Sequence, residues 1–222
     1  MQKILLIEDR VTRQQLFMNE TSIKLDEYND ILDNCINHKY TDFLQDILRD
    51  EFDLDKYSII ITHKSAFEEK NIEVLSKLKK YCEVHQKPLV FFSGGISVNY
   101  YLNDAYESLE LNSKTFYSSN LTYFLKEFKA NNKNILMLCY GKKWRLNVAA
   151  NILEKTNNFI EKKKSFTDIL YSELSDMVDM ETLHKLNLEI AKNKIEDGWI
   201  DLENIESFRD DVFNYISELA DE

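Results

Sequence analysis

Three short apolar runs in the first half of the chain constrain its fold more than any other feature. They cover residues 4–7 (ILLI), 59–62 (IIIT) and 89–92 (LVFF). Each run is rich in β-branched or aromatic residues, and none alternates between polar and apolar side chains. Strands of this kind are buried on both faces, as in a parallel sheet that is covered by helices. The runs therefore predict an α/β fold.

The segment between the second and third runs has the spacing of a helix. Ile72, Leu75, Leu78 and either Tyr81 or Cys82 recur at the interval of one helix face. A strand, a helix and a second strand in this order form a βαβ crossover. The pattern therefore predicts that the second and third runs are neighbouring parallel strands.

Two further strands complete the predicted sheet. One is expected at 108–111, and the helix after it presents an apolar face over 121–128. The least distinct strand is expected at 30–33, before a helix at 41–49. We therefore expect a parallel sheet of five strands in an α/β domain over residues 1–130.

The remaining residues, 131–222, have a helical pattern. Apolar residues recur on one helix face within 146–160 and again within 205–219. Ser165 and Asp179 are suitable N-caps for two further helices. We expect an all-α region over this part of the chain.

Composition excludes several classes of protein. Of the 222 residues, 44% are hydrophobic, and no apolar run is long enough to cross a membrane. The N-terminal run becomes acidic at Glu8, which is too early for a signal peptide. Cys35, Cys82 and Cys139 have no CxxC spacing, which disfavours a disulfide framework or a zinc site. We expect a cytoplasmic protein that does not bind membranes.

Charge is distributed unevenly along the chain. The net charge is −11, which disfavours binding to a phosphate backbone. Residues 133–164 nevertheless hold eight basic and two acidic residues, or +6, whereas residues 165–222 hold four basic and sixteen acidic ones, or −12. The two segments are solvated faces, or they dock on each other, or the first is a basic patch for an anionic partner.

Aromatic and basic residues are interleaved in one part of the basic segment. They are Lys142, Lys143, Trp144 and Arg145. Such a stretch can stack bases and contact phosphates, or its tryptophan can anchor the helical region by packing. We favour the anchoring role, and we do not expect nucleic acid to be a partner.

Several motifs, taken in order, resemble the receiver domains of response regulators. The motif KILLIED ends in Glu8 and Asp9 and is similar to the first strand and acidic pair of that family. The motif PLVFFSG contains Ser93 and is similar to the fourth strand, which ends in a hydroxyl residue. The motif KTF begins at Lys114 and resembles the Lys-Pro-Phe that follows the fifth strand. The resemblance covers roughly the first 130 residues.

The resemblance implies a flavodoxin-like, doubly wound sheet with an acidic pair that holds Mg²⁺. It also implies that Ser93 and Lys114 would contact a phosphoryl group. The third strand departs from the family, because it ends in His63, or in Thr62 if the register slips by one, where the phosphoacceptor aspartate should stand. A neutral imidazole can neither form an aspartyl phosphate nor replace a carboxylate ligand of a hard cation. We therefore expect a pseudo-receiver without a cofactor, and Mg²⁺ binding is disfavoured.

Five residues should converge at the carboxyl ends of the strands, where ligands of such sheets bind. They are Glu8, Asp9, His63, Ser93 and Lys114. The cluster could bind a metal, a phosphate or a small anion. Alternatively it is a relic, in which Lys114 forms a salt bridge with Asp9 or Glu8 and His63 is packed. We favour the relic.

Two further features could mediate binding. Gly94 and Gly95 could form a backbone nest for an anion, although a turn that needs positive φ explains them more simply. Tyr101, Phe116 and Tyr117 would lie near the face through which receivers signal, and an exposed aromatic cluster there would suit a protein interface.

These observations favour a non-enzymatic signalling or adaptor protein that binds a protein partner. No complete catalytic constellation is visible in the sequence. The alternative is a sensor or enzyme that binds a nucleotide or a metal through the receiver pocket. The identity of the partner and the formation of a homodimer are left open.

Overall fold

The computed structural model describes residues 2–67, 71–163, 168–170 and 199–221. The chain divides into two compact units, Met1–Lys142 and Lys143–Glu222. The first unit extends beyond residue 130, where the sequence placed the end of the α/β domain. Ile135 and Leu138 explain the difference, because both side chains are fully buried.

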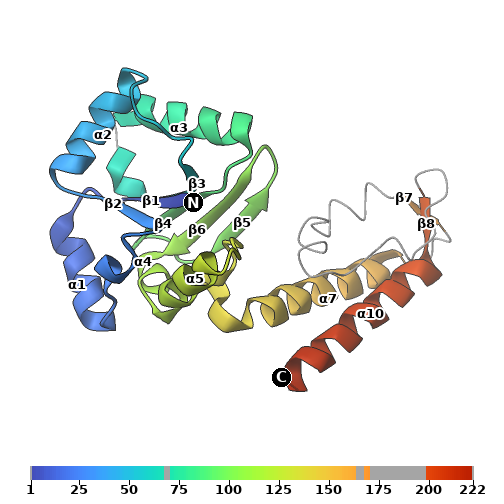
Figure 1. Cartoon of the computed structure of the whole chain (residues 1–222). Coiled ribbons are helices and arrows are strands. Elements are labelled where there is room, and N and C mark those ends of the chain that lie inside the picture. Colours follow the sequence, from blue (N-terminus) through green and yellow to red (C-terminus); the bar gives the residue numbers. More distant parts are fainter. Residues whose placement is uncertain (1, 68–70, 164–167, 171–198, 222) are drawn as a thin grey trace. The chain divides into compact units, whose positions relative to one another are not determined.

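The first unit is built on a six-stranded, mostly parallel sheet (Figure 1). Its strands are β1 (Lys3–Ile7), β2 (Leu32–Cys35), β3 (Tyr57–His63), β4 (Leu89–Ser93), β5 (Tyr100–Asn103) and β6 (Glu107–Asn112). Their order is β2-β1-β3-β4-β6-β5. All neighbours pair in parallel except β5, which is antiparallel to β6. The α/β class is therefore confirmed, and the sheet is compatible with a Rossmann or flavodoxin-like fold.

The expected count of five strands is wrong, because β5 adds a sixth at the edge of the sheet. Its side chains alternate between exposed and half-buried, so its sequence lacks the continuous apolar run of a central strand. The other edge strand, β2, begins at Leu32, two residues later than expected. Only its first and last residues are buried, which explains why its sequence signal is weak.

Helices cover both faces of the sheet (Figure 1). They are α1 (Val11–Thr21), α2 (His38–Leu48), α3 (Ile72–His85) and α5 (Ser119–Lys129), with shorter turns at η1 (Leu25–Tyr28), η2 (Lys64–Phe67), α4 (Ser113–Phe116), α6 (Met137–Tyr140) and η4 (Gly141–Lys143). Leu5 of β1 belongs to the core that contains Phe43 of α2 and Leu78 of α3. Because side chains alternate along a strand, Ile4 and Leu6 face the opposite layer, and both are buried. Burial on both faces accounts for the uninterrupted apolar runs.

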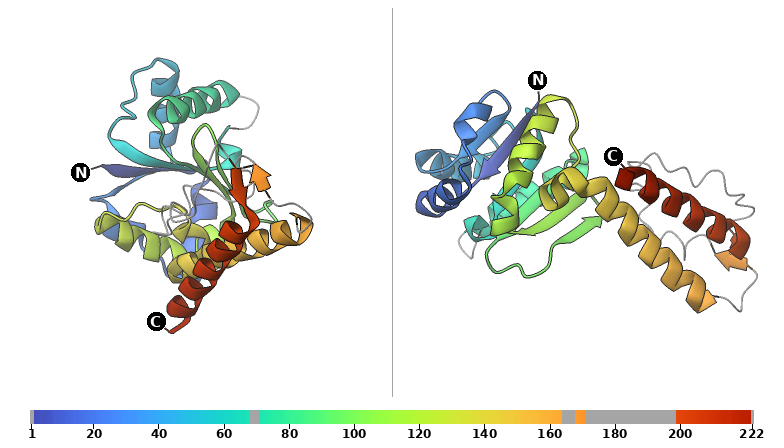
Figure 2. Two further views of the ribbon diagram at one scale, coloured as in Figure 1. Left: turned by 90° about the vertical axis from the view of Figure 1, so that its right-hand side faces the viewer. Right: turned by 90° about the horizontal axis from the view of Figure 1, so that it is seen from below.

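The second unit contains α7 (Trp144–Lys163), β7 (Asp168–Leu170), β8 (Trp199–Asp201) and α10 (Leu202–Asp221). The helices α7 and α10 pack side by side (Figure 2). Ile152, Thr156 and Ile160 lie four residues apart on α7 and are buried, as is Val212 of α10. The long helix α10 agrees with the spacing of the apolar residues in this part of the sequence.

The expectation of an all-α region is corrected by the antiparallel pair β7–β8, in which Ile169 lies opposite Ile200. Residues 168–170 were expected to continue a helix capped by Ser165. Three residues are too few to carry a strand pattern, so pairing decides their conformation. The helix expected after Asp179 lies outside the described residues. Within the part of the chain that the structure describes, no helix is both long enough and apolar enough to cross a membrane.

Candidate functional site

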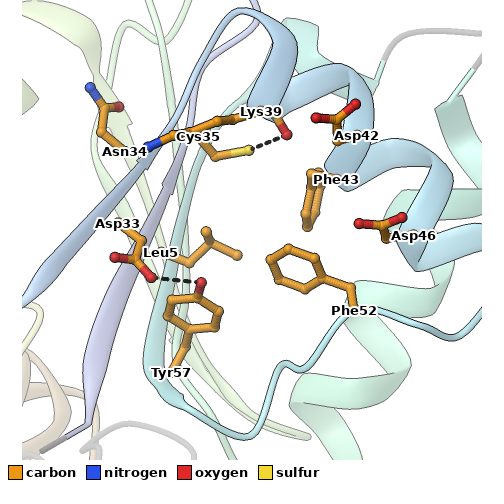
Figure 3. A pocket seen from close by; sticks show the side chains of 10 residues that line it. All are labelled: Leu5, Asp33, Asn34, Cys35, Lys39, Asp42, Phe43, Asp46, Phe52 and Tyr57. Atoms are coloured by element: carbon orange, nitrogen blue, oxygen red, sulfur yellow. Dashed lines mark hydrogen bonds between the residues drawn. The ribbon is translucent and has the colours of Figure 1, made fainter.

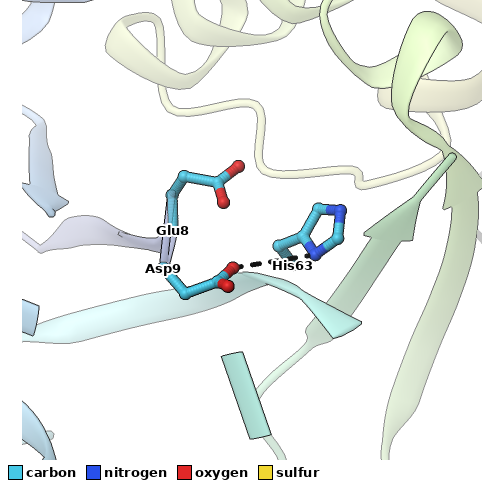
Figure 4. A group of neighbouring side chains, drawn as sticks. All are labelled: Glu8, Asp9 and His63. Carbon is cyan, nitrogen blue, oxygen red and sulfur yellow. Dashed lines mark ion pairs between the residues drawn. The ribbon is translucent and has the colours of Figure 1, made fainter. Parts of the chain in front are cut away.

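The candidate site lies at the carboxyl ends of β1 and β3 (Figure 4). Glu8 and Asp9 follow β1 directly, and His63 is the last residue of β3. Each of the three side chains has an oxygen or nitrogen atom that could bind a metal ion, and these atoms all lie within 4.8 Å of one another. His63 Nδ1 is 3.9 Å from Asp9 Oδ1. The structure thus brings together three of the five side chains that the sequence placed in one pocket.

Arg13 of α1 supplies the positive charge of this site. Its guanidinium donates to Oε1 of Glu8 and to Oδ1 of Asp9. Its Nε is also 3.5 Å from Glu8 Oε2. Because α1 starts immediately after the acidic pair, its first turn carries Arg13 back over both carboxylates. The sequence analysis missed this residue, although its spacing of four from Asp9 was a visible signal.

Burial and Arg13 act on the two carboxyl groups with different results. Glu8 is fully buried, and this burial raises its pKa, although hydrogen bonds from Arg13 and from the Arg10 backbone oppose the rise. Burial also disfavours the charged form of Asp9. Here the Ser65 hydrogen bond and the Arg13 charge prevail, so the pKa of Asp9 is lowered.

Ser65 connects the acidic pair to His63. Its hydroxyl lies 2.8 Å from Asp9 Oδ1, 3.1 Å from Arg13 Nη2 and 2.7 Å from His63 Nδ1. Its backbone N–H donates to the same His63 nitrogen over 3.0 Å. This geometry assigns Nδ1 as an acceptor, so the imidazole is neutral and carries its hydrogen on Nε2. Burial and the nearby Arg13 charge lower the pKa of His63 to about 4.

A buried polar network supports Glu8 from the other side. The Tyr117 hydroxyl donates to Glu8 Oε2 over 3.4 Å, and Gln14 donates to Tyr117 over 3.3 Å. Gln14 also exchanges hydrogen bonds of 3.1 and 2.8 Å with Asn34 of β2. These contacts hold Glu8 in one position, because a buried carboxylate is stable only when its oxygens are satisfied.

Ser93 and Lys114 do not join the Arg13 network. Ser93 ends β4, and its hydroxyl accepts from the Gly95 backbone over 3.4 Å. Lys114 is exposed, and its side chain forms no ion pair with the other described residues. The salt bridge expected between Lys114 and Asp9 or Glu8 is therefore wrong, because Arg13 occupies the position beside both carboxylates.

Gly94 and Gly95 form an exposed turn after β4. The turn is closed by a hydrogen bond of 3.3 Å from the Ile96 N–H to the Ser93 carbonyl. Neither glycine has a positive φ, and a Cβ at Gly94 would meet nothing within 4 Å. The expectation that this turn needs positive φ is therefore wrong.

Two of the expected surface aromatics are buried instead. Phe116 and Tyr117 are fully buried. Their ring centroids lie 4.2 and 5.4 Å from that of Phe92, so they form part of the core. Tyr101 is half-buried, and its hydroxyl donates to Glu107 over 3.0 Å. An exposed patch made of Phe116 and Tyr117 is thereby excluded.

The basic stretch that begins at Lys142 has exposed charges and a buried ring. Lys142, Lys143 and Arg145 are exposed. Trp144 is only 5% exposed, and the Arg145 guanidinium lies 5.5 Å from its ring centroid. A buried indole cannot stack on a nucleic-acid base, so this geometry favours a packing role for Trp144.

Comparisons with models of protein families, with curated proteins and with solved structures found no match. Inference about function therefore depends on the chemistry of the site.

The geometry disfavours two kinds of chemistry. A divalent cation between Glu8 and Asp9 would need the position that the Arg13 guanidinium holds, so the site as built does not fit Mg²⁺. A catalytic triad needs the carboxylate and the hydroxyl on opposite ring nitrogens of the histidine. Asp9 and Ser65 both approach Nδ1 of His63, so the imidazole cannot relay a proton between them in that way.

Proposed function

We propose that this chain is a non-enzymatic signalling or adaptor protein that binds a protein partner through a phosphorylation-independent pseudo-receiver domain and a helical unit. The strand order β2-β1-β3-β4-β6 supports the resemblance, because doubly wound sheets of the flavodoxin type have this order. Cys35, Cys82 and Cys139 are buried free thiols, which suits a cytoplasmic location.

The observation that carries the proposal is the guanidinium of Arg13 between Glu8 and Asp9. A receiver needs a metal ion at its acidic pair and a carboxylate at the end of the third strand. Here an internal guanidinium bridges the two carboxylates, and a neutral imidazole stands at the end of β3. On this proposal, the contacts of Arg13 hold the site in one conformation without a metal ion or a phosphate group.

The first test is exposure of the purified chain to a small-molecule phosphodonor with Mg²⁺, followed by intact mass spectrometry. An active receiver domain in the same reaction serves as the positive control. We expect an adduct on the control and none on this chain, because no nucleophilic carboxylate stands at the end of β3. An acid-labile phosphate adduct on the wild-type chain would overturn the proposal.

The second test addresses the partner. The tagged chain is isolated from its native host with and without nuclease, and the associated material is identified. A stoichiometric protein that survives nuclease treatment supports an adaptor. Recovery of the chain alone contradicts it, and loss of the associated material on nuclease treatment favours the basic stretch at Lys142 as a nucleic-acid contact.

A metal- or nucleotide-binding sensor is the second candidate, favoured by the clustering of Glu8, Asp9 and His63 within 4.8 Å. It requires Arg13 to leave the carboxylates. Thermal unfolding with Mg²⁺, Mn²⁺ and a panel of nucleotides distinguishes the two functions, because a bound ligand stabilises the fold by mass action. Stabilisation of the wild type favours the sensor, whereas stabilisation of Arg13→Ala alone shows that the guanidinium excludes the metal.

A further inference from the structure

Two neighbouring hollows lie on the side of the sheet that α2 covers, and Phe52 lines both. The first has a volume of about 330 Å³ and lies between α2, β2 and β3 (Figure 3). The second, of about 240 Å³, lies between the segment that follows α2 and the helix α3. We call the two hollows together the Phe52 groove.

Aromatic residues line part of each hollow of the Phe52 groove. The Phe43 and Phe52 rings meet edge to face with centroids 4.9 Å apart. Tyr57 lines the first hollow, and Tyr81 lines the second. The faces of these rings already attract ammonium groups of the chain itself. The Lys56 Nζ lies 5.3 Å from the centroids of Phe52 and of Tyr57. This electrostatic preference of the rings suits a cationic ligand.

The charges around the groove have the complementary sign. Three aspartates and one lysine are among the residues that line each hollow, so the lining residues of each carry a net charge of −2. They are Asp33, Asp42, Asp46 and Lys39 in the first, and Asp50, Asp53, Asp55 and Lys77 in the second. Hollows of one charge with low-dielectric walls concentrate ligands of the opposite charge.

Some of these carboxylates have partners within the protein. Asp33 accepts from Lys3 over 2.7 Å and from the Tyr57 hydroxyl over 2.9 Å, and Asp50 pairs with Lys77 over 2.8 Å. In contrast, Asp42 and Asp46 form no ion pair with another described residue. They lie one turn apart on α2, and both line the first hollow (Figure 3).

The arrangement fits an extended basic segment better than a metal ion. Among the described residues, no three carboxylates of the groove come close enough together to form a metal-binding group. Two hollows that share Phe52 in their lining instead match two cationic side chains on a linking backbone. Lysine and arginine stems can pack on Phe52 while their charged ends reach the aspartates.

We propose that the Phe52 groove binds a basic segment of a partner protein, with one lysine or arginine side chain in each hollow. The inference rests on the proposed function, because it assumes that the chain binds a protein. It adds the chemistry of the partner and the surface that recognises it.

The test uses fluorescein-labelled peptides that carry two arginines separated by one, two or three serines. Matched peptides with glutamate in place of arginine are the controls. Fluorescence anisotropy with the full-length chain at 0.15 M salt, about the physiological ionic strength, measures the dissociation constants. We expect at least one arginine peptide to bind, no glutamate peptide to bind, and the affinity to fall as salt is raised.

Variants of the chain distinguish binding of the arginine peptides in the groove from their general attraction to an acidic protein. Asp42→Asn/Asp46→Asn should weaken binding about tenfold, which corresponds to about 1.4 kcal/mol. The control Glu20→Gln/Asp26→Asn also removes two carboxylates, both of them exposed, but it leaves both hollows intact, so we expect it to change the affinity less than about twofold. Phe52→Leu should weaken binding without any change in net charge.

Equal losses in the two double variants, or no binding of any arginine peptide, would overturn the proposal. Circular dichroism of each variant verifies that the fold is retained. If the chain captures a protein partner equally well with Asp42→Asn/Asp46→Asn, the groove is excluded while the adaptor function stands. If the wild type takes up phosphate yet binds the arginine peptide in the groove, only the pseudo-receiver function fails.

Discussion

The first unit presents two acidic regions whose carboxylates differ in how they are satisfied. At the carboxyl ends of β1 and β3, Glu8 and Asp9 share the guanidinium of Arg13, and Glu8 is fully buried. In the Phe52 groove, Asp42 is exposed, and neither Asp42 nor Asp46 has an ion-pair partner among the described residues. In the first region the buried carboxylate is paired within the protein, whereas the second region leaves the carboxylates of Asp42 and Asp46 without an internal cation.

This difference indicates which region is available to a ligand. A buried carboxylate without a cation is costly, so the fold must supply one, and the guanidinium then occupies the position that a cationic ligand would need. An exposed carboxylate costs little, so it can remain unpaired until a partner arrives. The resemblance to receivers points to the first region, but its charges are already engaged.

The largest effect should follow from removal of the internal cation. Arg13→Met leaves the Glu8 carboxylate buried and unpaired, so we expect the free energy of unfolding at pH 7 to fall by about 3–5 kcal/mol. Urea denaturation monitored by circular dichroism measures this loss. A second change, Glu8→Gln, should restore part of the stability, because it removes the charge that Arg13 compensates.

Arg10→Met is the matched control for this prediction. Arg10 lies 3.5 Å from Asp9, but its side chain is 63% exposed, so its loss should cost less than about 1 kcal/mol. Similar losses in the two arginine variants would show that the Arg13 pair is no more important than a surface contact. The internal pairing at Arg13 would then not distinguish this region from the Phe52 groove.

The pH dependence of the free energy of unfolding should show the contribution of the buried His63 imidazole. Its pKa falls from 6.5 to about 4 in the folded chain, so the unfolded chain binds its proton more readily. Stability should therefore decrease as the pH falls from 6.5 to 4, by on the order of 3 kcal/mol from this residue. Urea denaturation of the wild type and of His63→Gln at each pH isolates this contribution, since glutamine does not titrate.

Glu8 and Asp9 also change the stability of the fold as the pH changes, and the directions of their pKa shifts give the sign of each effect. The raised pKa of Glu8 means that its folded form retains a proton above pH 4.5, so stability falls as the pH rises through that range, opposite to His63. The lowered pKa of Asp9 acts below 3.8, outside the interval of interest. Because both groups are present in both proteins, they cancel in the difference. Equal slopes for the wild type and His63→Gln would contradict a buried, neutral imidazole.

The sequence predicted the centre of the fold better than its edges. The strands β1, β3 and β4 are buried on both faces, so burial alone dictates their continuous apolar runs. The edge strands β2 and β5 are only partly covered, and their pairing depends on backbone hydrogen bonds that leave no composition signal. Likewise, β7 and β8 are too short for a pattern to appear.

The sequence was sufficient to predict where the candidate site lies, but not which cation contacts its carboxylates. A residue that ends a buried parallel strand must lie at the carboxyl edge of the sheet, which places Glu8, Asp9 and His63 correctly. Which cation reaches them depends on side-chain reach and helix direction, and these favour Arg13 on α1 over Lys114. The hydrogen bond between Ser65 and Asp9 could not be predicted either, because the two residues are 56 positions apart in the sequence.

The smallest expected effects are changes in the free energy of unfolding that have opposite signs for two carboxylates of the Phe52 groove. Asp42 and Asp46 lie one turn apart on α2 and repel each other, so Asp46→Asn should raise the free energy of unfolding by about 0.2–0.5 kcal/mol. Asp33→Asn removes the charge that pairs with Lys3, so it should lower stability by about 1 kcal/mol. Urea denaturation at low and high salt measures both changes. The gain from Asp46→Asn should vanish near 1 M salt, because the Debye length is then about 3 Å. A loss of stability in Asp46→Asn would mean that this carboxylate has a partner within the protein, and the groove would then be as self-contained as the site at Arg13.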